Sequence, residues 1–157
     1  MERSKRMYGS TDLLLDDKGR IRIPAKFLAV LGTVYPEQPL YYVIYNEHRI
    51  AVMPECILDQ KTEELNNISP NDLKAMNALS KILGSVEELT KDGQGRTVIP
   101  KTLKQEVGID KEVVVVGMGD YFEVWAKAVH TETVGNMSRM EANETAYGRA
   151  RELSDKS

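Results

Sequence analysis

An internal repeat constrains the possible fold of this chain more than any other feature of its sequence. Residues 16–24 and 92–100 both follow the pattern Asp-x-x-Gly-Arg-x-x-Ile-Pro, at an offset of 76 residues. The match continues to Gly32 and Gly108, and it resumes at an offset of 72 residues after a short insertion near Pro36 in the first copy. Self-similarity at a fixed offset indicates one small structural unit that is used twice.

Each copy is expected to contain the same order of elements. Apolar runs between turn signals predict two strands, then a short helix, then a β-hairpin. A unit of about 45 residues cannot bury an adequate core alone, so the two units should pack on one another. The predicted strands are residues 10–16, 20–23, 40–46 and 49–53 in the first copy and residues 85–91, 96–99, 112–117 and 121–125 in the second.

Proline and glycine predict where the two short helices begin and end. Pro24 and Pro100 suit the first helical position, where a missing N–H costs nothing. Gly32 and Gly108 suit the left-handed residue that commonly ends a helix. The two helices are therefore expected to start and stop at equivalent places.

The segment between the two units has helical spacing. Ser69, with an acid three residues on, is typical of a helix start, and apolar side chains recur every three or four positions from Leu73 to Leu83, before Gly84 ends the helix. We interpret this stripe as core packing, with subunit contact as the alternative. The expected domains are module 1 at 7–56, a helical connector at 57–84, module 2 at 85–129, and a polar tail at 130–157 that is weakly helical between 139 and 153.

The repeated motif predicts a rigid loop in each copy. Its aspartate can accept hydrogen bonds from backbone N–H groups two or three residues ahead, and its glycine supplies the positive φ of a tight turn. Its arginine returns to within reach of the aspartate. These roles make the aspartates and glycines structural, and the positions concerned are Asp16, Gly19, Asp92 and Gly95.

Positive charge gathers at the start of the chain. The whole chain has a net charge of −3, whereas residues 1–26, with seven Lys or Arg against four Asp or Glu, carry +3. An acidic protein that contacts nucleic acid must use a local patch. The candidate DNA-binding residues are Arg3, Lys5, Arg6, Lys18, Arg20, Arg22 and Arg96.

The two motif loops differ in charge. The first copy holds three cations within residues 18–22, whereas Gln94 and Val98 replace two of them in the second copy and leave Arg96. Clustered Lys and Arg suit phosphate contact, and an arginine can approach guanine with two hydrogen bonds. We therefore expect the first loop to meet DNA, with Arg20 reading a base edge, and we expect Arg96 mainly to brace its own turn.

Nothing in the sequence indicates an enzyme. The two histidines, His48 and His130, fall in a predicted turn and after the last predicted strand, and there is no nucleophile elbow, phosphate-binding loop or metal-ligand spacing. We expect no catalytic site, metal, cofactor or small-molecule substrate. No apolar run reaches the roughly 18 residues that a bilayer requires, so we expect no membrane association and a cytoplasmic location.

The doubled motif has a close parallel in a known family. Together with residues 111–117 (Lys-Glu-Val-Val-Val-Val-Gly) and 122–125 (Phe-Glu-Val-Trp), it resembles the MraZ family, whose two modules are of the SpoVT/AbrB type, over residues 7–130. The resemblance implies an α+β, mainly β fold, in which two tandem swapped-hairpin modules pack as an intrachain pseudo-dimer with connecting helices. It also implies that several chains form a homo-oligomeric ring.

The same resemblance implies a function. The chain would be a sequence-specific transcriptional regulator that binds double-stranded DNA at short tandem repeats upstream of the division and cell-wall gene cluster, and that associates with the nucleoid. The alternative is an antitoxin-like AbrB-family module that sequesters a partner protein. Binding to its own upstream DNA would favour the first class, and a neighbouring toxin gene would favour the second.

Overall fold

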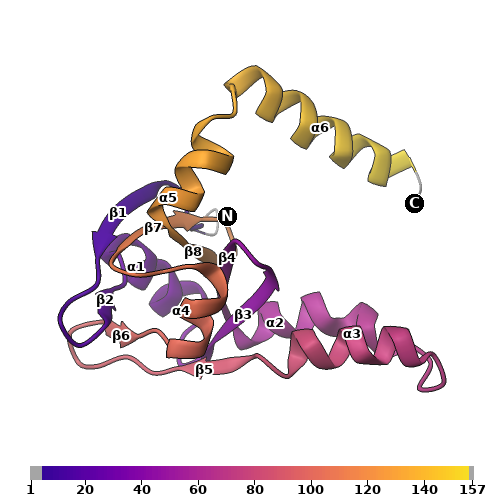
Figure 1. Ribbon diagram of the computed structural model, residues 1–157, viewed down its shortest axis with the longest axis horizontal. Coiled ribbons are helices and arrows are strands. Elements are labelled where there is room, and N and C mark those ends of the chain that lie inside the picture. Colours follow the sequence, from indigo (N-terminus) through magenta and orange to yellow (C-terminus); the bar gives the residue numbers. More distant parts are fainter. Residues whose placement is uncertain (1–4, 156–157) are drawn as a thin grey trace.

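A six-stranded antiparallel sheet and a separate two-stranded ribbon organise the molecule (Figure 1). The computed structural model describes residues 5–155. The fold is α+β with a mainly antiparallel sheet, as predicted. In spatial order, the sheet contains β1 (Ser10–Leu14), β7 (Glu112–Gly117), β8 (Phe122–Ala126), β4 (Arg49–Pro54), β3 (Leu40–Asn46) and β5 (Glu87–Leu89), and the ribbon contains β2 (Arg20–Arg22) and β6 (Arg96–Val98).

Helices flank the sheet and extend beyond it. Two short helices follow the ribbon strands, and the helices that connect the repeats lie together on one side of the molecule, whereas the last helix projects above the sheet (Figure 1). No helix between residues 5 and 155 is both long enough and apolar enough to cross a membrane. The helices are α1 (Ala25–Val34), α2 (Glu55–Thr62), η1 (Glu63–Asn67), α3 (Leu73–Leu83), α4 (Lys101–Val107), α5 (Lys127–His130), η2 (Thr131–Gly135) and α6 (Arg139–Asp155).

Strands of the two repeats pair with each other in four places. β1 of the first repeat pairs with β7 of the second, and β5 of the second pairs with β3 of the first. β4 pairs with β8, and β2 pairs with β6. Neither repeat therefore forms a sheet of its own, and the sheet exists only because the two repeats are interleaved.

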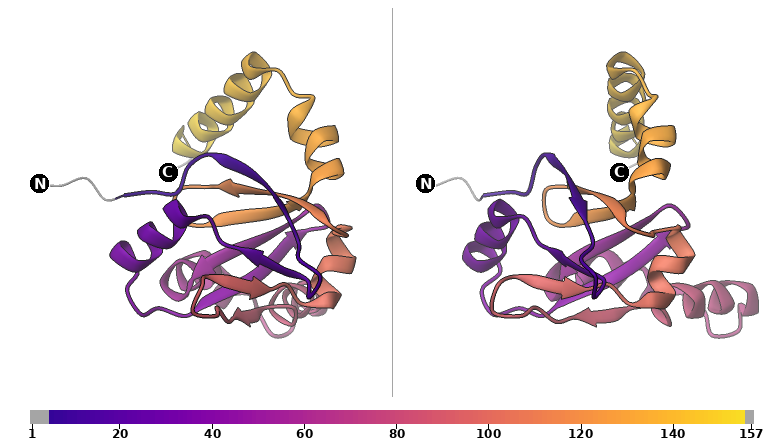
Figure 2. Two further views of the ribbon diagram at one scale, coloured as in Figure 1. Left: turned by 90° about the vertical axis from the view of Figure 1, so that its left-hand side faces the viewer. Right: turned by 60° about the vertical axis from the view of Figure 1, so that its left-hand side comes forward.

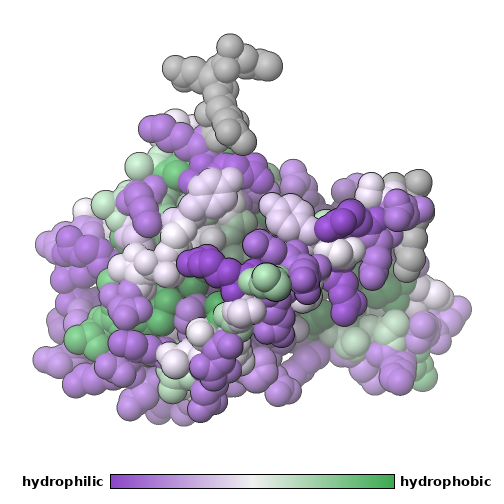
Figure 3. Space-filling model, turned by 90° about the horizontal axis from the view of Figure 1, so that it is seen from above, coloured by the Kyte–Doolittle hydropathy of each residue, from purple (hydrophilic) through white to green (hydrophobic). Residues whose placement is uncertain are grey.

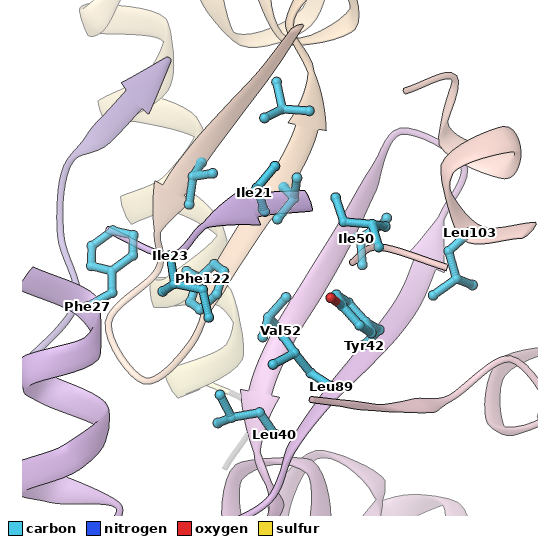
Figure 4. Packing of buried hydrophobic residues seen from close by; sticks show 14 of the residues in the cluster. Ile21, Ile23, Phe27, Leu40, Tyr42, Ile50, Val52, Leu89, Leu103 and Phe122 are labelled. Atoms are coloured by element: carbon cyan, nitrogen blue, oxygen red, sulfur yellow. The ribbon is translucent and has the colours of Figure 1, made fainter. Parts of the chain in front are cut away.

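The main core lies between the sheet and the ribbon. Ile50 and Phe122 point from the sheet, Ile21 points from the ribbon, and Phe27 and Leu103 close the sides from α1 and α4 (Figure 4). The rings of Phe27 and Phe122 are stacked, with centroids 5.5 Å apart. Because strand residues alternate between faces, the ribbon buries its middle residues and turns its outer ones toward solvent.

A second, smaller core covers the face of the sheet that points away from the ribbon. A smaller apolar cluster forms where α2 packs on β3 and β4, and beside it Trp125 is buried on β8. The Trp125 indole N–H donates to Glu123 at 3.1 Å, and the Arg49 guanidinium lies 3.9 Å from the centre of the indole ring. The Arg49 guanidinium also forms an ion pair with the buried Glu123 carboxylate at 3.4 Å.

Three of the predicted helix boundaries are wrong. Pro24 and Pro100 do not occupy the first helical position, because both have non-helical ψ angles (135° and 136°) and precede the helices as caps. The Pro24 carbonyl accepts from the Leu28 N–H at 3.0 Å. Gly32 does not end α1, which continues to Val34 because its apolar face still packs on the core. Gly108 does end α4, with a φ of 74°, as predicted.

The connector also differs from the sequence-based prediction. Asp72, not Ser69, caps α3, since its side chain accepts from the Ala75 N–H at 3.1 Å, whereas the Ser69 hydroxyl accepts from Asn71 in the preceding turn. The interpretation of the α3 stripe as core packing is wrong, because α3 contains no buried residue and Leu73 is 74% exposed. The helix in the tail ends at Asp155, two residues beyond the predicted end, and α6 contains no buried residue.

Candidate nucleic-acid interface

The first motif loop is closed by its own aspartate. One oxygen of Asp16 accepts from the backbone N–H groups of Lys18 and Arg20, both at 2.9 Å, and the other accepts from the Arg20 Nε at 2.7 Å. Gly19 has a φ of 75°, a conformation that costs a residue with a side chain about 1–2 kcal/mol. The aspartate therefore binds N–H groups two and four residues ahead, instead of two or three.

The second motif loop repeats this geometry. Asp92 accepts from the N–H groups of Gln94 and Arg96 at 2.9 Å and from the Arg96 Nε at 2.8 Å, and Gly95 has a φ of 75°. Arg20 is thus braced in the same way as Arg96. From charge alone, we expected Arg20 to read a base edge and Arg96 to brace its own turn. The geometry of the two loops does not distinguish the two arginines in this way.

Hydrogen bonding keeps both motif aspartates ionised. The Arg96 backbone N–H, together with the other donors of the loop, lowers the pKa of Asp92 from 3.8 to about 2. The Arg20 backbone N–H lowers the pKa of Asp16 for the same reason. The loops therefore keep their ion pairs throughout the neutral range.

The ribbon turns three arginines outward. Ile21 and Thr97 form its buried middle pair, so Arg20, Arg22 and Arg96 lie on the opposite, solvent-facing side. Arg22 is exposed and makes no ion pair with any residue from 5 to 155.

A buried hydroxyl pair holds the ribbon on the sheet. The Tyr42 hydroxyl lies 2.8 Å from the Thr97 hydroxyl and 3.3 Å from the Val98 carbonyl oxygen. Burial raises the pKa of Tyr42 to about 12, so this side chain stays protonated and can donate. The ribbon is therefore positioned by a polar contact as well as by apolar packing.

The two loops lie at opposite ends of the ribbon (Figure 2). Arg20 is opposite Val98 at the end next to the first loop, and Arg22 is opposite Arg96 at the end next to the second. The outward face consequently carries cations along its whole length. Each end combines residues of both repeats.

Helices of the other repeat pack beneath each loop. A Cβ atom placed on Gly95 would lie 2.7 Å from a methyl carbon of Leu28 in α1, and one placed on Gly19 would lie 3.3 Å from the Lys104 Nζ in α4. Leu28 and Lys104 occupy equivalent positions at the offset of 76 residues. The sequence did not indicate a role for Lys104, although the offset shows that it is equivalent to Leu28. Lys104 reaches the first loop only because strands of the two repeats pair with each other.

Among the described amino-terminal cations, Arg6 is held away from the first loop. Arg6 forms an ion pair with Asp120 at 3.2 Å, and Met7 exchanges backbone hydrogen bonds with Gly119 at 2.9 and 2.7 Å, which fixes this segment beside the β7–β8 turn. Lys5 is exposed. Arg3 lies outside the described residues. Arg6, a candidate DNA-binding residue, is therefore neutralised by Asp120 and does not lie with the first loop.

Comparison with known proteins finds relatives that are named as transcriptional regulators. Residues 82–150 match the family model described as "MraZ protein, putative antitoxin-like". A transcriptional regulator MraZ of Oenococcus oeni is 36% identical over 72% of this chain and 76% of its own length. A protein of the same name from Leuconostoc citreum is 34% identical over 71% of this chain and 75% of its own length. Another from Ruegeria is 31% identical over 82% of this chain and 81% of its own length.

These relatives are all named as regulators of transcription. The chain belongs to the MraZ family.

Proposed function

We propose that this chain is a sequence-specific DNA-binding transcriptional regulator that contacts double-stranded DNA through the outward face of the β2–β6 ribbon and the two motif loops. The observation that carries the proposal is the row formed by Arg20, Arg22 and Arg96 on a ribbon whose inner side is buried. A two-stranded ribbon fits the major groove of B-form DNA. The arginines can then contact phosphates or guanine edges.

The ribbon places two positive charges close together, which lowers its stability. Arg22 and Arg96 are directly opposite each other, and like charges in cross-strand pairs destabilise a ribbon. Only Arg96 of the two has an acidic partner between residues 5 and 155. A phosphate bound between the two guanidinium groups would offset their repulsion, which supports an anionic ligand at this face.

We further propose that the two repeats form an intrachain pseudo-dimer of swapped hairpins. The exchange of β1 and β5 between repeats supports this description, as does the pairing of equivalent strands in β2–β6 and β4–β8. The proposed units are module 1 at 7–56 and module 2 at 85–129, joined by the connector at 57–84 and followed by the tail at 130–157.

Several chains are proposed to assemble as a homo-oligomeric ring on short tandem repeats upstream of the division and cell-wall gene cluster, in the cytoplasm and in association with the nucleoid. The exposed apolar stripe of α3 supports association, as do the apolar patches on the upper face of an otherwise mostly hydrophilic surface (Figure 3). Tandem sites raise the effective concentration of each weak contact, so an acidic protein can bind with a small basic patch on each subunit.

An antitoxin-like interaction module is the second candidate. The antitoxin-like description of the matched family model favours it, and so does α6, on which Met140, Tyr147 and Leu153 are 72%, 64% and 71% exposed. In that case α6 would bind a partner protein, and the ribbon would not contact DNA.

Binding to a fluorescent duplex from immediately upstream of the protein's own coding sequence separates the two candidates. A scrambled duplex of the same length and composition is the control. We expect tighter binding to the upstream duplex, with an affinity that falls steeply as salt rises, because each phosphate contact contributes a log–log slope of about −0.9. Equal binding to both duplexes, or an affinity that salt does not change, would reject the proposed regulator.

A further inference from the structure

The charge of each motif loop is neutral when only its own residues are counted. Residues 16–20 hold two acids, one lysine and one arginine, and residues 92–96 hold one acid and one arginine. Asp16 and Asp92 are ionised, because hydrogen bonds lower both of their pKa values. Neither loop alone therefore carries a net positive charge that would attract DNA.

A residue of the other repeat makes each end of the ribbon positive. At the second loop this residue is Arg22, which lies opposite Arg96 in the ribbon. At the first loop it is Lys104, whose ammonium group lies 3.3 Å from the position that a Cβ on Gly19 would occupy. Lys104 is half-buried and forms no ion pair with a residue in the described range of 5–155, so its charge is not cancelled.

The equivalent position at the second loop has no charge. Leu28 packs against Gly95 where Lys104 packs against Gly19, and Val98 stands in the second repeat where Arg22 stands in the first. The end with Lys104 consequently lacks an arginine opposite Arg20, and the end with Arg22 lacks a lysine beside its loop. Each end therefore gains one positive charge from the other repeat, through a different residue.

We propose that Lys104 contacts a DNA phosphate at the first loop, so that this end of the interface is built by both repeats. The proposal rests on the proposed function, since it names a further DNA contact at the same surface. An ammonium group on a flexible stem provides a phosphate contact without sequence information, whereas an arginine pair can also read bases. The two ends would therefore bind DNA unequally, with Lys18 and Lys104 fixing the phosphates at one end.

The test compares salt dependence in two matched variants. Lys104→Met keeps most of the apolar stem and removes the charge, and Lys74→Met does the same on α3, on the other side of the molecule from the ribbon (Figure 1). With the upstream duplex as probe, Lys104→Met should lower the magnitude of the log–log salt slope by about 0.9 per bound subunit and weaken binding roughly fivefold at 0.15 M salt. It should do so equally for the scrambled duplex. Lys74→Met should keep the wild-type slope.

The converse experiment adds a positive charge at Leu28, the position equivalent to Lys104. Leu28→Lys can keep its stem on the core while its ammonium group reaches solvent above the second loop, so the slope should increase in magnitude by a similar amount. A wild-type slope in Lys104→Met, or in a folded Leu28→Lys variant, would overturn the inference and leave the proposed function standing. A wild-type protein that binds neither duplex would overturn both.

Discussion

At the scale of single residues, the motif aspartates determine how the loops respond to acid. The folded-state pKa of Asp92 is about 2, below the ordinary value of 3.8, so the stabilisation it provides is present above about pH 4 and is lost as the pH falls toward 2. Asp92→Asn should lower the melting temperature at pH 7, and its difference from wild type should shrink between pH 4 and pH 2. A difference that stays constant over this range would contradict the account. Thermal denaturation monitored by circular dichroism at each pH provides the measurement.

The two motif arginines give a matched pair of substitutions. Arg20 and Arg96 make the same contact through Nε with their own aspartates, at 2.7 and 2.8 Å. Arg20→Ala and Arg96→Ala should therefore lower the melting temperature by similar amounts. Each should also reduce discrimination between the upstream and scrambled duplexes by about 1–3 kcal/mol, if each arginine reads a base edge. Should only one variant lose discrimination, the ends would have separate reading and bracing roles, as the sequence comparison alone suggested.

At the scale of elements, the ribbon depends on the hydroxyl pair beneath it. Tyr42→Phe leaves the buried Thr97 hydroxyl without its 2.8 Å partner, which should cost about 1–3 kcal/mol of unfolding free energy. Replacing both residues, in Tyr42→Phe with Thr97→Val, should recover much of that loss because no polar group is then left unpaired. Urea denaturation of the single and double variants measures the coupling, and strictly additive losses would show that the pair does not hold the ribbon.

The helices and strands also show which parts of the fold could be predicted from the sequence alone and which could not. The sequence predicted the eight strands that lie within residues 5–155, and it predicted both loops because Asp, Gly and Arg have local roles that depend little on the rest of the chain. It could not show that α1 passes Gly32, since the packing of α1 on the core decides that boundary. Nor could it place Lys104 beside Gly19, because that neighbourhood arises from strand pairing between residues far apart in sequence.

At the scale of the whole molecule, the exposed apolar surfaces predict association. Leu73 and Leu83 on α3 are 74% and 41% exposed, and the outer edge of β1 is unpaired among the described residues. Such surfaces favour contact between copies. Light scattering should give a mass several times 17.7 kDa at micromolar concentration. A mass near that of a single chain would contradict the proposed ring.

The outward face of the ribbon is proposed as the DNA interface, and a charge reversal at Arg22 tests this proposal. Its side chain is exposed and forms no ion pair within residues 5–155, so Arg22→Glu should keep the fold. Because a glutamate opposite Arg96 removes a like-charge pair, the melting temperature should stay the same or rise slightly. Arg149→Glu on the exposed helix α6 makes the same charge change away from the ribbon. In fluorescence anisotropy with the upstream duplex, Arg22→Glu should abolish binding at 0.15 M salt, whereas Arg149→Glu should bind like wild type. Wild-type affinity in a folded Arg22→Glu protein would contradict the proposal.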